Sequence, residues 1–289
     1  MNAEVTSITK ARKKKPTAEA KPVRVRRTKI AIPADFAVLV ALIRQKYRQR
    51  QDFLMAEGNL TRQMKSIERR ITAIKHPPDK PNGKSTCDCE GEACHAMAIA
   101  YTLPLEEARA GIHTHKMDAE KDLTTLAEAL PIYSSVVEGI AGFGAVGLGQ
   151  IVGEAGDIGG YKSPGPLFKR MGLAVIDGIA QRKFKDKELA LKMGYNPRRR
   201  SVMHVIGDSL LKRTDNPYYV IYQERKAYEV AQAEAAGLIV IEAAKIPNSA
   251  EKAKGYRSKG HIHLRAMRYT EKRLLKHIWQ AWRGEVPHD

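Results

Sequence analysis

The sequence predicts a mainly α-helical protein, and three observations indicate this fold class. Apolar residues recur at helical spacing through long segments of the chain, and prolines and glycines separate those segments. Only 6% of the residues are aromatic although 43% are hydrophobic, so we expect a core of Leu, Ile, Val and Ala. A chain of 289 residues has room for one large domain or two small ones.

The net charge is strongly positive and unevenly distributed. The chain carries 50 Lys and Arg against 32 Asp and Glu, a formal net charge of +18. Residues 1–30 alone hold ten Lys and Arg and two Glu, and their Lys, Pro and Ala content predicts a disordered basic tail. Such an excess of positive charge repels itself in a compact protein, so nucleic acid is the expected partner.

Several features argue against secretion and against a membrane. No apolar core of a signal peptide follows the basic N-terminus. The uncharged run over 139–153 has 15 residues, six of them Gly, which is shorter than the ~20 residues that span a bilayer. The three Cys, an odd number within residues 87–94, fit a reducing compartment. We therefore expect a cytoplasmic, nucleoid-associated protein with no membrane contact.

Residues 31–131 are predicted to form a helical region with coiled-coil character. Apolar residues follow the rhythm of a helix seam over 34–57 and again over 60–74. The break at Gly58-Asn59 predicts two helices, which are antiparallel or kinked at the glycine, and the prolines after His76 end the second. The two seams consist of Phe36, Val40, Ile43, Tyr47 and Leu54, then of Leu60, Met64, Ile67, Ile71 and Ile74.

The second half of this region contains a predicted loop and a long helix. A Cys-bearing loop is expected over 77–95, and helix resumes around Ala93. Pro104 is predicted to begin the long helix at its first turn, and Pro131 ends it. A seam this long needs a partner helix from this chain or from a second copy, so we expect a homo-oligomer through the coiled coil. The seam consists of Leu105, Ala108, Ile112, Ala119, Leu123, Leu126 and Leu130.

A glycine-rich stretch near the start of residues 132–284 allows more than one interpretation. Gly142, Gly144 and Gly147 spell the G-x-G-x-x-G of a dinucleotide site, which would make the chain an oxidoreductase. That site needs a preceding strand and an unbroken crossover helix, followed by an acidic residue. The candidate for this acidic residue is Asp177, which comes 35 residues after Gly142. The interval contains several glycines and prolines that would break the crossover helix. A helix-hairpin-helix fits better, because its bend requires glycine and its second helix points free amides at a phosphate. A tight turn without a ligand is the alternative.

The rest of residues 132–284 shows helical patterns around 198–213, 217–236 and 261–283. Short apolar runs at 173–176 and 238–241 fit either strand or helix. Ser163 stands where it would cap a helix that begins with a proline.

Basic residues cluster at both ends of the helix predicted around 198–213. Arg198 to Arg200 follow Asn196-Pro197 and occupy its first turns. Cations at a helix start oppose the helix dipole by about 0.5 kcal/mol each, a cost that bound phosphates would explain. A solvated basic face is the alternative. The predicted DNA-contacting residues are Gly142, Gly144, Lys162, Arg198, Arg199, Arg200, Lys212 and Arg213.

The stretch "IAGFGAVGLGQIVGEAGDIGGYKSPGPLFKRMGL" resembles the C-terminal domain of the IS-one-ten (one-sixteen and nine-oh-two) insertion-sequence transposases. "NPRRRSVMHVIGDSLLKRTDNPYYVIYQERK" is similar to the family's basic helix and the Pro-started helix after it, and "HIHLRAMRYTEKRLLKHIWQAWRG" to its closing helix. The resemblance covers roughly residues 105–283. It implies a transposase-like DNA-binding domain over 132–284, and a protein of the transposase lineage that acts in DNA transposition and recombination.

The chain departs from the family at two places that concern catalysis. The family pairs this domain with an N-terminal RNase-H-like domain whose four acidic residues hold catalytic Mg²⁺, whereas residues 1–130 show no strand that opens with an acidic residue. The family also places a nucleophilic serine before a glycine, where Asp177-Gly178 stand here, and an aspartate cannot serve as the attacking alcohol. We therefore assign no catalytic residue and expect Mg²⁺ only with a catalytic partner or site.

Two functions follow from these departures. The chain is either a transposase, acting alone or with a partner for the chemistry, or a catalytically silent relative that binds or regulates DNA. Structured RNA stays open as a ligand beside DNA. Among cofactors, zinc is a candidate at the Cys-bearing loop, because four soft ligands stand within nine residues, and free thiols are the alternative. These ligands are Cys87, Cys89, Cys94 and His95.

Overall fold

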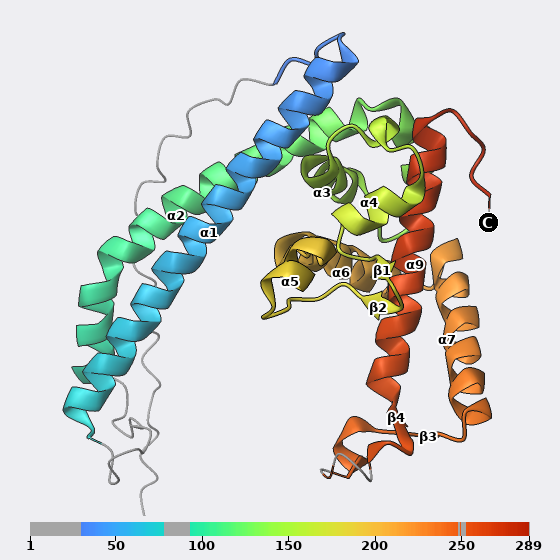
Figure 1. Ribbon diagram of the computed structural model, residues 1–289. Coiled ribbons are helices and arrows are strands. Elements are labelled where there is room, and N and C mark those ends of the chain that lie inside the picture. Colours follow the sequence, from blue (N-terminus) through green and yellow to red (C-terminus); the bar gives the residue numbers. More distant parts are fainter. Residues whose placement is uncertain (1–29, 78–92, 248, 250–252, 289) are drawn as a thin grey trace, which may run out of the picture. The chain divides into compact units, whose positions relative to one another are not determined.

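The computed structural model describes residues 30–77, 93–247, 249 and 253–288 (Figure 1). The chain divides into a unit of residues 1–30 and a compact unit of residues 31–289. The predicted basic tail lies outside the described residues, apart from its last position. In the described part, helices dominate and the strands form two two-stranded sheets. The prediction of a mainly α-helical protein is confirmed.

Two long helices, α1 (Phe36–Lys75) and α2 (Ala93–Glu128), pack side by side in opposite directions (Figure 1). Ion pairs fix their register. Lys46 pairs with Asp122 at 3.1 Å, and Arg50 Nε lies 2.6 Å from Glu120 Oε2. Residue numbers therefore increase along α1 where they decrease along α2, as in an antiparallel pair. The partner of the long apolar seam is therefore a helix of the same chain. Oligomerisation through a coiled coil stays a prediction.

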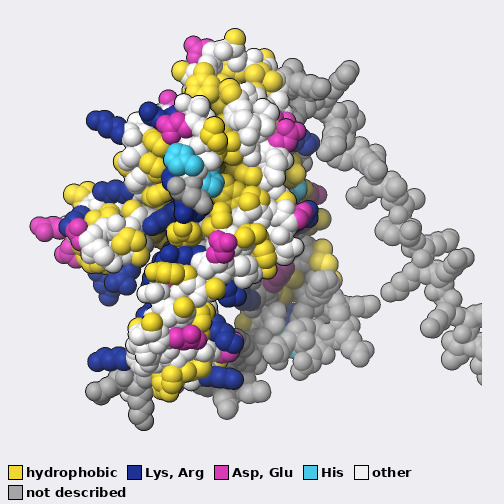
Figure 2. Space-filling view, turned by 90° about the vertical axis from the view of Figure 1, so that its right-hand side faces the viewer, with side chains coloured by type: hydrophobic (Ala, Val, Ile, Leu, Met, Phe, Trp, Pro, Cys, Tyr) yellow, Lys and Arg dark blue, Asp and Glu magenta, His cyan; other side chains and the backbone are white. Residues whose placement is uncertain are grey.

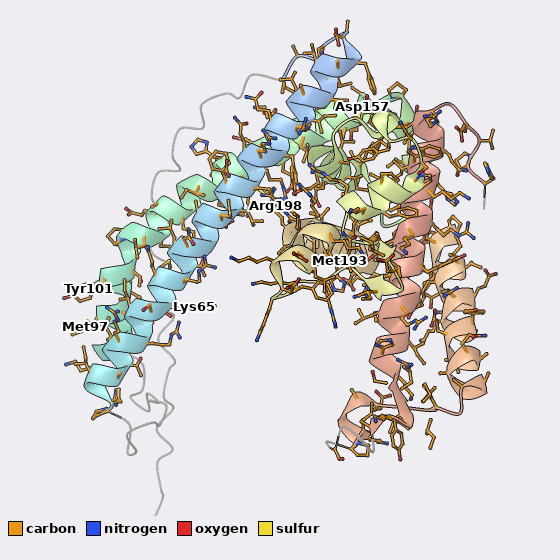
Figure 3. The ribbon with its side chains drawn as sticks, in the orientation of Figure 1. Lys65, Met97, Tyr101, Asp157, Met193 and Arg198 are labelled. Carbon is orange, nitrogen blue, oxygen red and sulfur yellow. The ribbon has the colours of Figure 1, made fainter. Side chains whose placement is uncertain are left out.

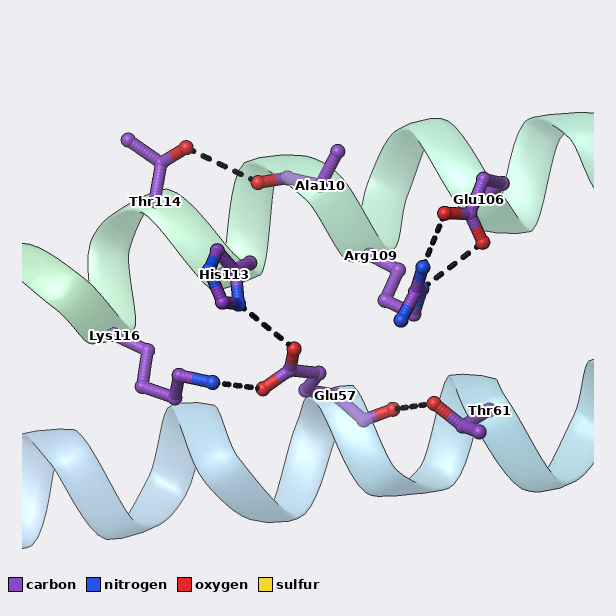
Figure 4. Close-up of polar contacts among 8 residues, drawn as sticks. All are labelled: Glu57, Thr61, Glu106, Arg109, Ala110, His113, Thr114 and Lys116. Atoms are coloured by element: carbon purple, nitrogen blue, oxygen red, sulfur yellow. Dashed lines mark hydrogen bonds and ion pairs between the residues drawn. The ribbon is translucent and has the colours of Figure 1, made fainter.

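Helix α1 runs without a break through Gly58-Asn59, so the predicted division into two helices is wrong. A glycine inside a helix costs only about 1 kcal/mol relative to alanine, and contacts with α2 offset it. Just before the glycine, Glu57 accepts hydrogen bonds from His113 Nδ1 at 2.9 Å and Lys116 Nζ at 2.5 Å (Figure 4). Helix α1 ends at Lys75, as the prolines after His76 predict.

Pro104 lies inside α2 rather than at its first turn, because the helix already begins at Ala93. An internal proline costs about 3 kcal/mol through its missing N–H, and the packing of α2 along α1 compensates. The predicted seam is buried from Ala119 to Leu130, but Ala108 is exposed. The seam therefore faces the protein core only in the second half of α2.

A short π-helix, η1 (Tyr133–Val137), and a turn connect α2 to α3 (Ala145–Ala155). Helix α3 packs on both long helices, and a Cβ at Gly153 would lie 2.4 Å from the Tyr47 ring, so only glycine fits there. Because the π-helix η1 and a turn precede Gly142, the dinucleotide motif lacks the preceding strand that its geometry needs. Ile151 and Val152 are fully buried, while Val146 is half-buried.

The remaining elements surround α9 (Lys259–Trp282), which packs on α4, α6 and α7 (Figure 1). Both apolar runs contain strands. Val175–Ile176 pairs antiparallel with Ile179–Ala180, and Ile239–Ile241 pairs parallel with Tyr256–Ser258. In order, the elements between α3 and α9 are η2 (Ile158–Gly160), α4 (Pro164–Arg170), β1 (Val175–Ile176), β2 (Ile179–Ala180), α5 (Lys187–Met193), α6 (Pro197–Leu211), α7 (Pro217–Ala235), β3 (Ile239–Ile241), η3 (Ala243–Lys245) and β4 (Tyr256–Ser258).

Three helices were expected in this part of the chain, and α6, α7 and α9 confirm them. Ser163 precedes α4 at the capping position, with Pro164 first in the helix, but its hydroxyl makes no capping hydrogen bond. Within the described ranges, no helix is both long enough and apolar enough to cross a membrane. Fully buried side chains from both halves of residues 31–289 form the core: Ile43, Tyr47, Leu123, Leu126, Leu148, Ile151, Ile158, Leu167, Met203, Leu274, Leu275 and Ile278.

Candidate nucleic-acid interface

A buried carboxylate at the end of α3 binds the first turn of α6. Glu154 is 3% exposed and accepts hydrogen bonds from Arg198 Nε at 2.7 Å and Arg199 Nε at 3.1 Å. The Tyr47 hydroxyl donates a third bond at 2.8 Å. Burial alone would raise the pKa of Glu154, but these hydrogen bonds and the charge of Arg198 bring it below its usual value. Glu154 therefore stays ionised and joins α1, α3 and α6.

A second buried carboxylate binds the third arginine. Glu271 on α9 is fully buried, and its Oε2 accepts a hydrogen bond from Arg200 at 2.7 Å. Its Oε1 has no hydrogen-bond partner and lies where a Cβ on Gly207 would come within 2.8 Å. Burial raises the pKa of Glu271 to about 7, although Arg200 and Arg268 oppose this shift. Arg200 thus belongs to the packing of α6 against α9.

The structure offers its own explanation for the arginines at the start of α6. Asn196 caps the helix, with its side-chain oxygen accepting from the backbone amides of Arg198 and Arg199, and the two buried carboxylates bind the three guanidinium groups. Bound phosphates are therefore not needed to account for cations at this helix start. The Arg198 side chain is still 52% exposed (Figure 3), whereas those of Arg199 and Arg200 are 18% and 12% exposed.

The glycine turn before α3 packs against the other end of α6. Gly142 has φ +85°, and a Cβ there would lie 2.6 Å from the Ser209 carbonyl oxygen and 3.1 Å from Arg213 Cγ. Only glycine satisfies both constraints. Gly142 and Gly144 are exposed, and Gly144 caps α3 without a side chain. The structure thus brings the predicted turn next to the predicted basic end of α6.

The other predicted basic residues near this turn lie on the surface. Lys212 pairs with Asp208 at 2.5 Å and Arg213 with Asp215 at 3.5 Å, and all four side chains are largely exposed. Lys162 is exposed in the link before α4.

A cationic cavity lies between α7, α9 and the β1–β2 hairpin, with a volume of about 340 Å³. Four cationic side chains and a single carboxylate, Glu229, line it. Glu229 is 5% exposed and lies 2.6 Å from both Arg225 and Arg265. Within the described part of the chain, Arg268 and Lys272 form neither a side-chain hydrogen bond nor an ion pair. The cavity therefore has more cations than the protein neutralises.

The unpaired cations of this cavity experience an unfavourable environment. Burial lowers the pKa of Lys272, and the neighbouring charges of Arg268 and Arg225 lower it further. Burial and Arg200 likewise lower the pKa of Arg268, and the nearby carboxylate of Glu271 offsets this only in part. An anion bound in the cavity would relieve both effects, because it supplies the missing negative charge and the hydrogen-bond acceptors. Figure 2 shows several separate groups of Lys and Arg side chains on the face of the molecule that it displays, among acidic and hydrophobic side chains.

Sequence reasoning missed this cavity, although part of its signal was present. His261, Arg265, Arg268 and Lys272 follow one another at spacings of four, three and four residues, which places them on one face of α9. The periodicity of the apolar residues does not reveal this face, whereas the spacing of the basic residues does. The contribution of Arg225 from α7 depends on tertiary packing.

The predicted zinc ligands lie largely outside the described residues, and the position of the family's serine forms a turn. Cys87 and Cys89 lie outside the described residues, and Cys94 and His95 begin α2 with side chains that are also outside them. Elsewhere in the described ranges, no group of three or more Cys, His, Asp or Glu is arranged to hold a metal ion. Asp177-Gly178 form the tight turn between β1 and β2.

Comparison of the chain with protein-family models, curated proteins and solved structures finds no match. The motifs in the sequence therefore carry the resemblance to the transposase C-terminal domain, and the geometry of the described residues carries the functional argument.

Proposed function

We propose that the chain is a DNA-binding protein of the transposase lineage that holds DNA by its backbone phosphates. The cationic cavity carries this proposal, because Arg268 and Lys272 are half-buried there and no carboxylate of the described residues forms an ion pair or hydrogen bond with either. A phosphate accepts several hydrogen bonds at once and is the anion that arginine and lysine bind most often on nucleic acids. The net charge of +18 supports a polyanionic ligand.

The start of α6 extends this proposed interface. Gly172 lines the cavity, and a Cβ there would lie 3.3 Å from Arg200 Cβ, so the cavity adjoins the first turn of α6. Arg198 has the most exposed side chain of the three arginines. We propose that Arg198 contacts a phosphate next to the one in the cavity, while Arg199 and Arg200 position the helix.

The glycine turn forms the second proposed contact, as a helix-hairpin-helix. Exposed Gly142 and Gly144 let a sugar-phosphate strand approach the first amides of α3, where the helix dipole favours an anion. Lys212 and Arg213 lie beside the turn, and a bound phosphate would compete there with their exposed partners Asp208 and Asp215. Lys162 is the remaining proposed contact.

A catalytically silent, regulatory relative is the second candidate function, and the β1–β2 turn favours it. Asp177 has φ 50° there and pairs with Lys192 at 2.6 Å, so the position of the family's serine holds an ion-paired carboxylate. Incubation of supercoiled DNA with the protein and Mg²⁺ separates the two candidates. Nicked product supports a transposase that cleaves, and intact DNA at saturating protein supports the silent relative.

Further properties accompany this proposal. We propose a cytoplasmic, nucleoid-associated location, a homo-oligomer formed through the long helices, and zinc at the Cys-bearing loop. Elemental analysis of the purified protein tests for zinc, and sedimentation tests the oligomeric state. Comparing the affinity of the protein for a structured RNA with its affinity for DNA tests which of the two is the ligand.

Fluorescence anisotropy on a labelled DNA duplex, over a range of salt concentrations, tests phosphate binding at the cavity. The double variant Arg268→Ala/Lys272→Ala should bind about tenfold or more weakly, and its plot of log affinity against log salt should be shallower by about two. The control Lys65→Ala/Arg70→Ala removes the same number of charges from two exposed positions on α1, of which Figure 3 labels Lys65. Equal losses in both variants would reduce the effect to net charge and refute the proposed site.

A further inference from the structure

A smaller cavity adjoins the cationic one. It has a volume of about 220 Å³ and is lined by residues of α7 and α9. Arg225 and Tyr269 line both cavities and form the wall between them. The smaller cavity adds Ile221, Glu224, Tyr228 and Arg273.

Flat side chains dominate the smaller cavity. The guanidinium carbon of Arg225 lies 4.4 Å from the centre of the Tyr228 ring and 4.7 Å from that of Tyr269, so it is stacked against two aromatic rings. Arg273 donates hydrogen bonds to the Tyr269 hydroxyl and fixes that ring. Tyr228 is 49% exposed, so part of its ring remains open to a ligand.

The chemistry of the two cavities differs in a way that matches the two ends of a nucleotide. The larger cavity has an excess of cations, which suits a phosphate. The smaller one presents the rings of Tyr228 and Tyr269, and the exposed carboxylate of Glu224 lines it. Its two arginines already have partners, because Arg225 pairs with Glu229 and Arg273 bonds the Tyr269 hydroxyl, so it suits a phosphate less well than the larger cavity does. A nucleobase is flat, stacks on tyrosine and arginine, and carries donors that a carboxylate accepts.

We propose that this cavity takes an unpaired nucleobase by stacking on Tyr228, while the phosphate of the same strand occupies the cationic cavity. This inference rests on the proposed phosphate binding and adds that the strand is single-stranded at this site. Bases of an intact duplex are stacked inside the helix, and their faces do not reach a protein side chain. The nucleic acid is therefore unpaired DNA or unpaired RNA.

Binding of three probes tests the inference: a short single-stranded DNA, a single-stranded RNA of the same sequence, and the corresponding DNA duplex. Tyr228→Ala should weaken binding of single strands by about 5- to 150-fold, the range expected for loss of one base stacked on an aromatic ring, and leave duplex binding within about twofold. Tyr228→Phe keeps the ring and should bind like the unchanged protein. The stronger of the two single-stranded probes identifies the sugar.

The outcomes separate this inference from the proposed function. Equal losses for single strands and duplex, or no loss in Tyr228→Ala, overturn the base-stacking site even when Arg268→Ala/Lys272→Ala weakens all three probes. If the unchanged protein binds none of the probes, both the phosphate cavity and the base site are wrong. Far-UV circular dichroism of each variant confirms that the helices remain folded.

Discussion

The buried carboxylate of Glu154 should be one of the largest single contributors to stability in residues 31–289. Replacing it by Gln leaves its charge-assisted bonds to Arg198, Arg199 and Tyr47 without an anion. Removing one partner of a buried ion pair costs about 3–5 kcal/mol. Because the Arg198 side chain is 52% exposed and can turn into water, we expect Glu154→Gln to lower the free energy of unfolding by about 2–4 kcal/mol.

Urea unfolding followed by circular dichroism measures this change, and a double-mutant cycle tests its cause. Tyr47→Phe removes one hydrogen bond to the carboxylate and should cost about 1.5–3 kcal/mol alone, but clearly less in the Glu154→Gln background. The control Glu138→Gln changes an exposed glutamate and should stay within about 0.5 kcal/mol. If Glu154→Gln unfolds like the control, or if the two effects simply add, the reasoning about this network is refuted.

Three further predictions follow from the same contacts. Burial raises the pKa of Glu271 from 4.5 to about 7, so its contribution to stability is full below pH 4.5 and is lost as the pH rises through 7. Glu271→Gln should therefore reduce the fall in the urea midpoint between about pH 5 and pH 8. An unchanged fall would assign the pH dependence to other groups. Gly142→Ala should destabilise the protein by about 1–3 kcal/mol, because position 142 has a positive φ and contacts Ser209. Gly144→Ala should change the stability little, because position 144 has φ −129° and open space around it. Similar thermal melts for both variants would contradict this account of the turn. Glu154→Gln releases Arg198, which the proposed interface places on a phosphate, so its DNA affinity, measured by anisotropy under conditions where the variant is folded, should rise. A fall in affinity would contradict the proposed contact of Arg198.

Local signals allowed the fold class and several helix ends to be predicted from sequence. The prolines at the starts of α4, α6 and α7 and the Asn caps of the last two act through neighbouring residues, so their effect is visible in the sequence. The helix breaks predicted at Gly58 and Pro104 do not occur, because packing between α1 and α2 compensates for the local penalty of each residue.

The candidate site depended more on tertiary structure. Arg198 was identified as basic and at a helix start, but its partner Glu154 is 44 positions away and no local pattern connects the two. The glycine turn was located correctly, and the reason for Gly142 includes a contact with Ser209 that only packing reveals. The cationic cavity combines one basic face of α9 with Arg225 of α7, and sequence periodicity alone shows only the first.

Chemical modification of Lys272 tests the central claim most directly. Its amine has a lowered pKa and lines the cavity, so it should react readily with an acetylating reagent in the free protein. We expect saturating DNA to suppress acetylation of Lys272, measured by peptide mass spectrometry, while acetylation of exposed Lys65 on α1 remains unchanged. Unchanged reactivity of Lys272 in the DNA-bound protein would show that no phosphate occupies the cavity and would contradict the account.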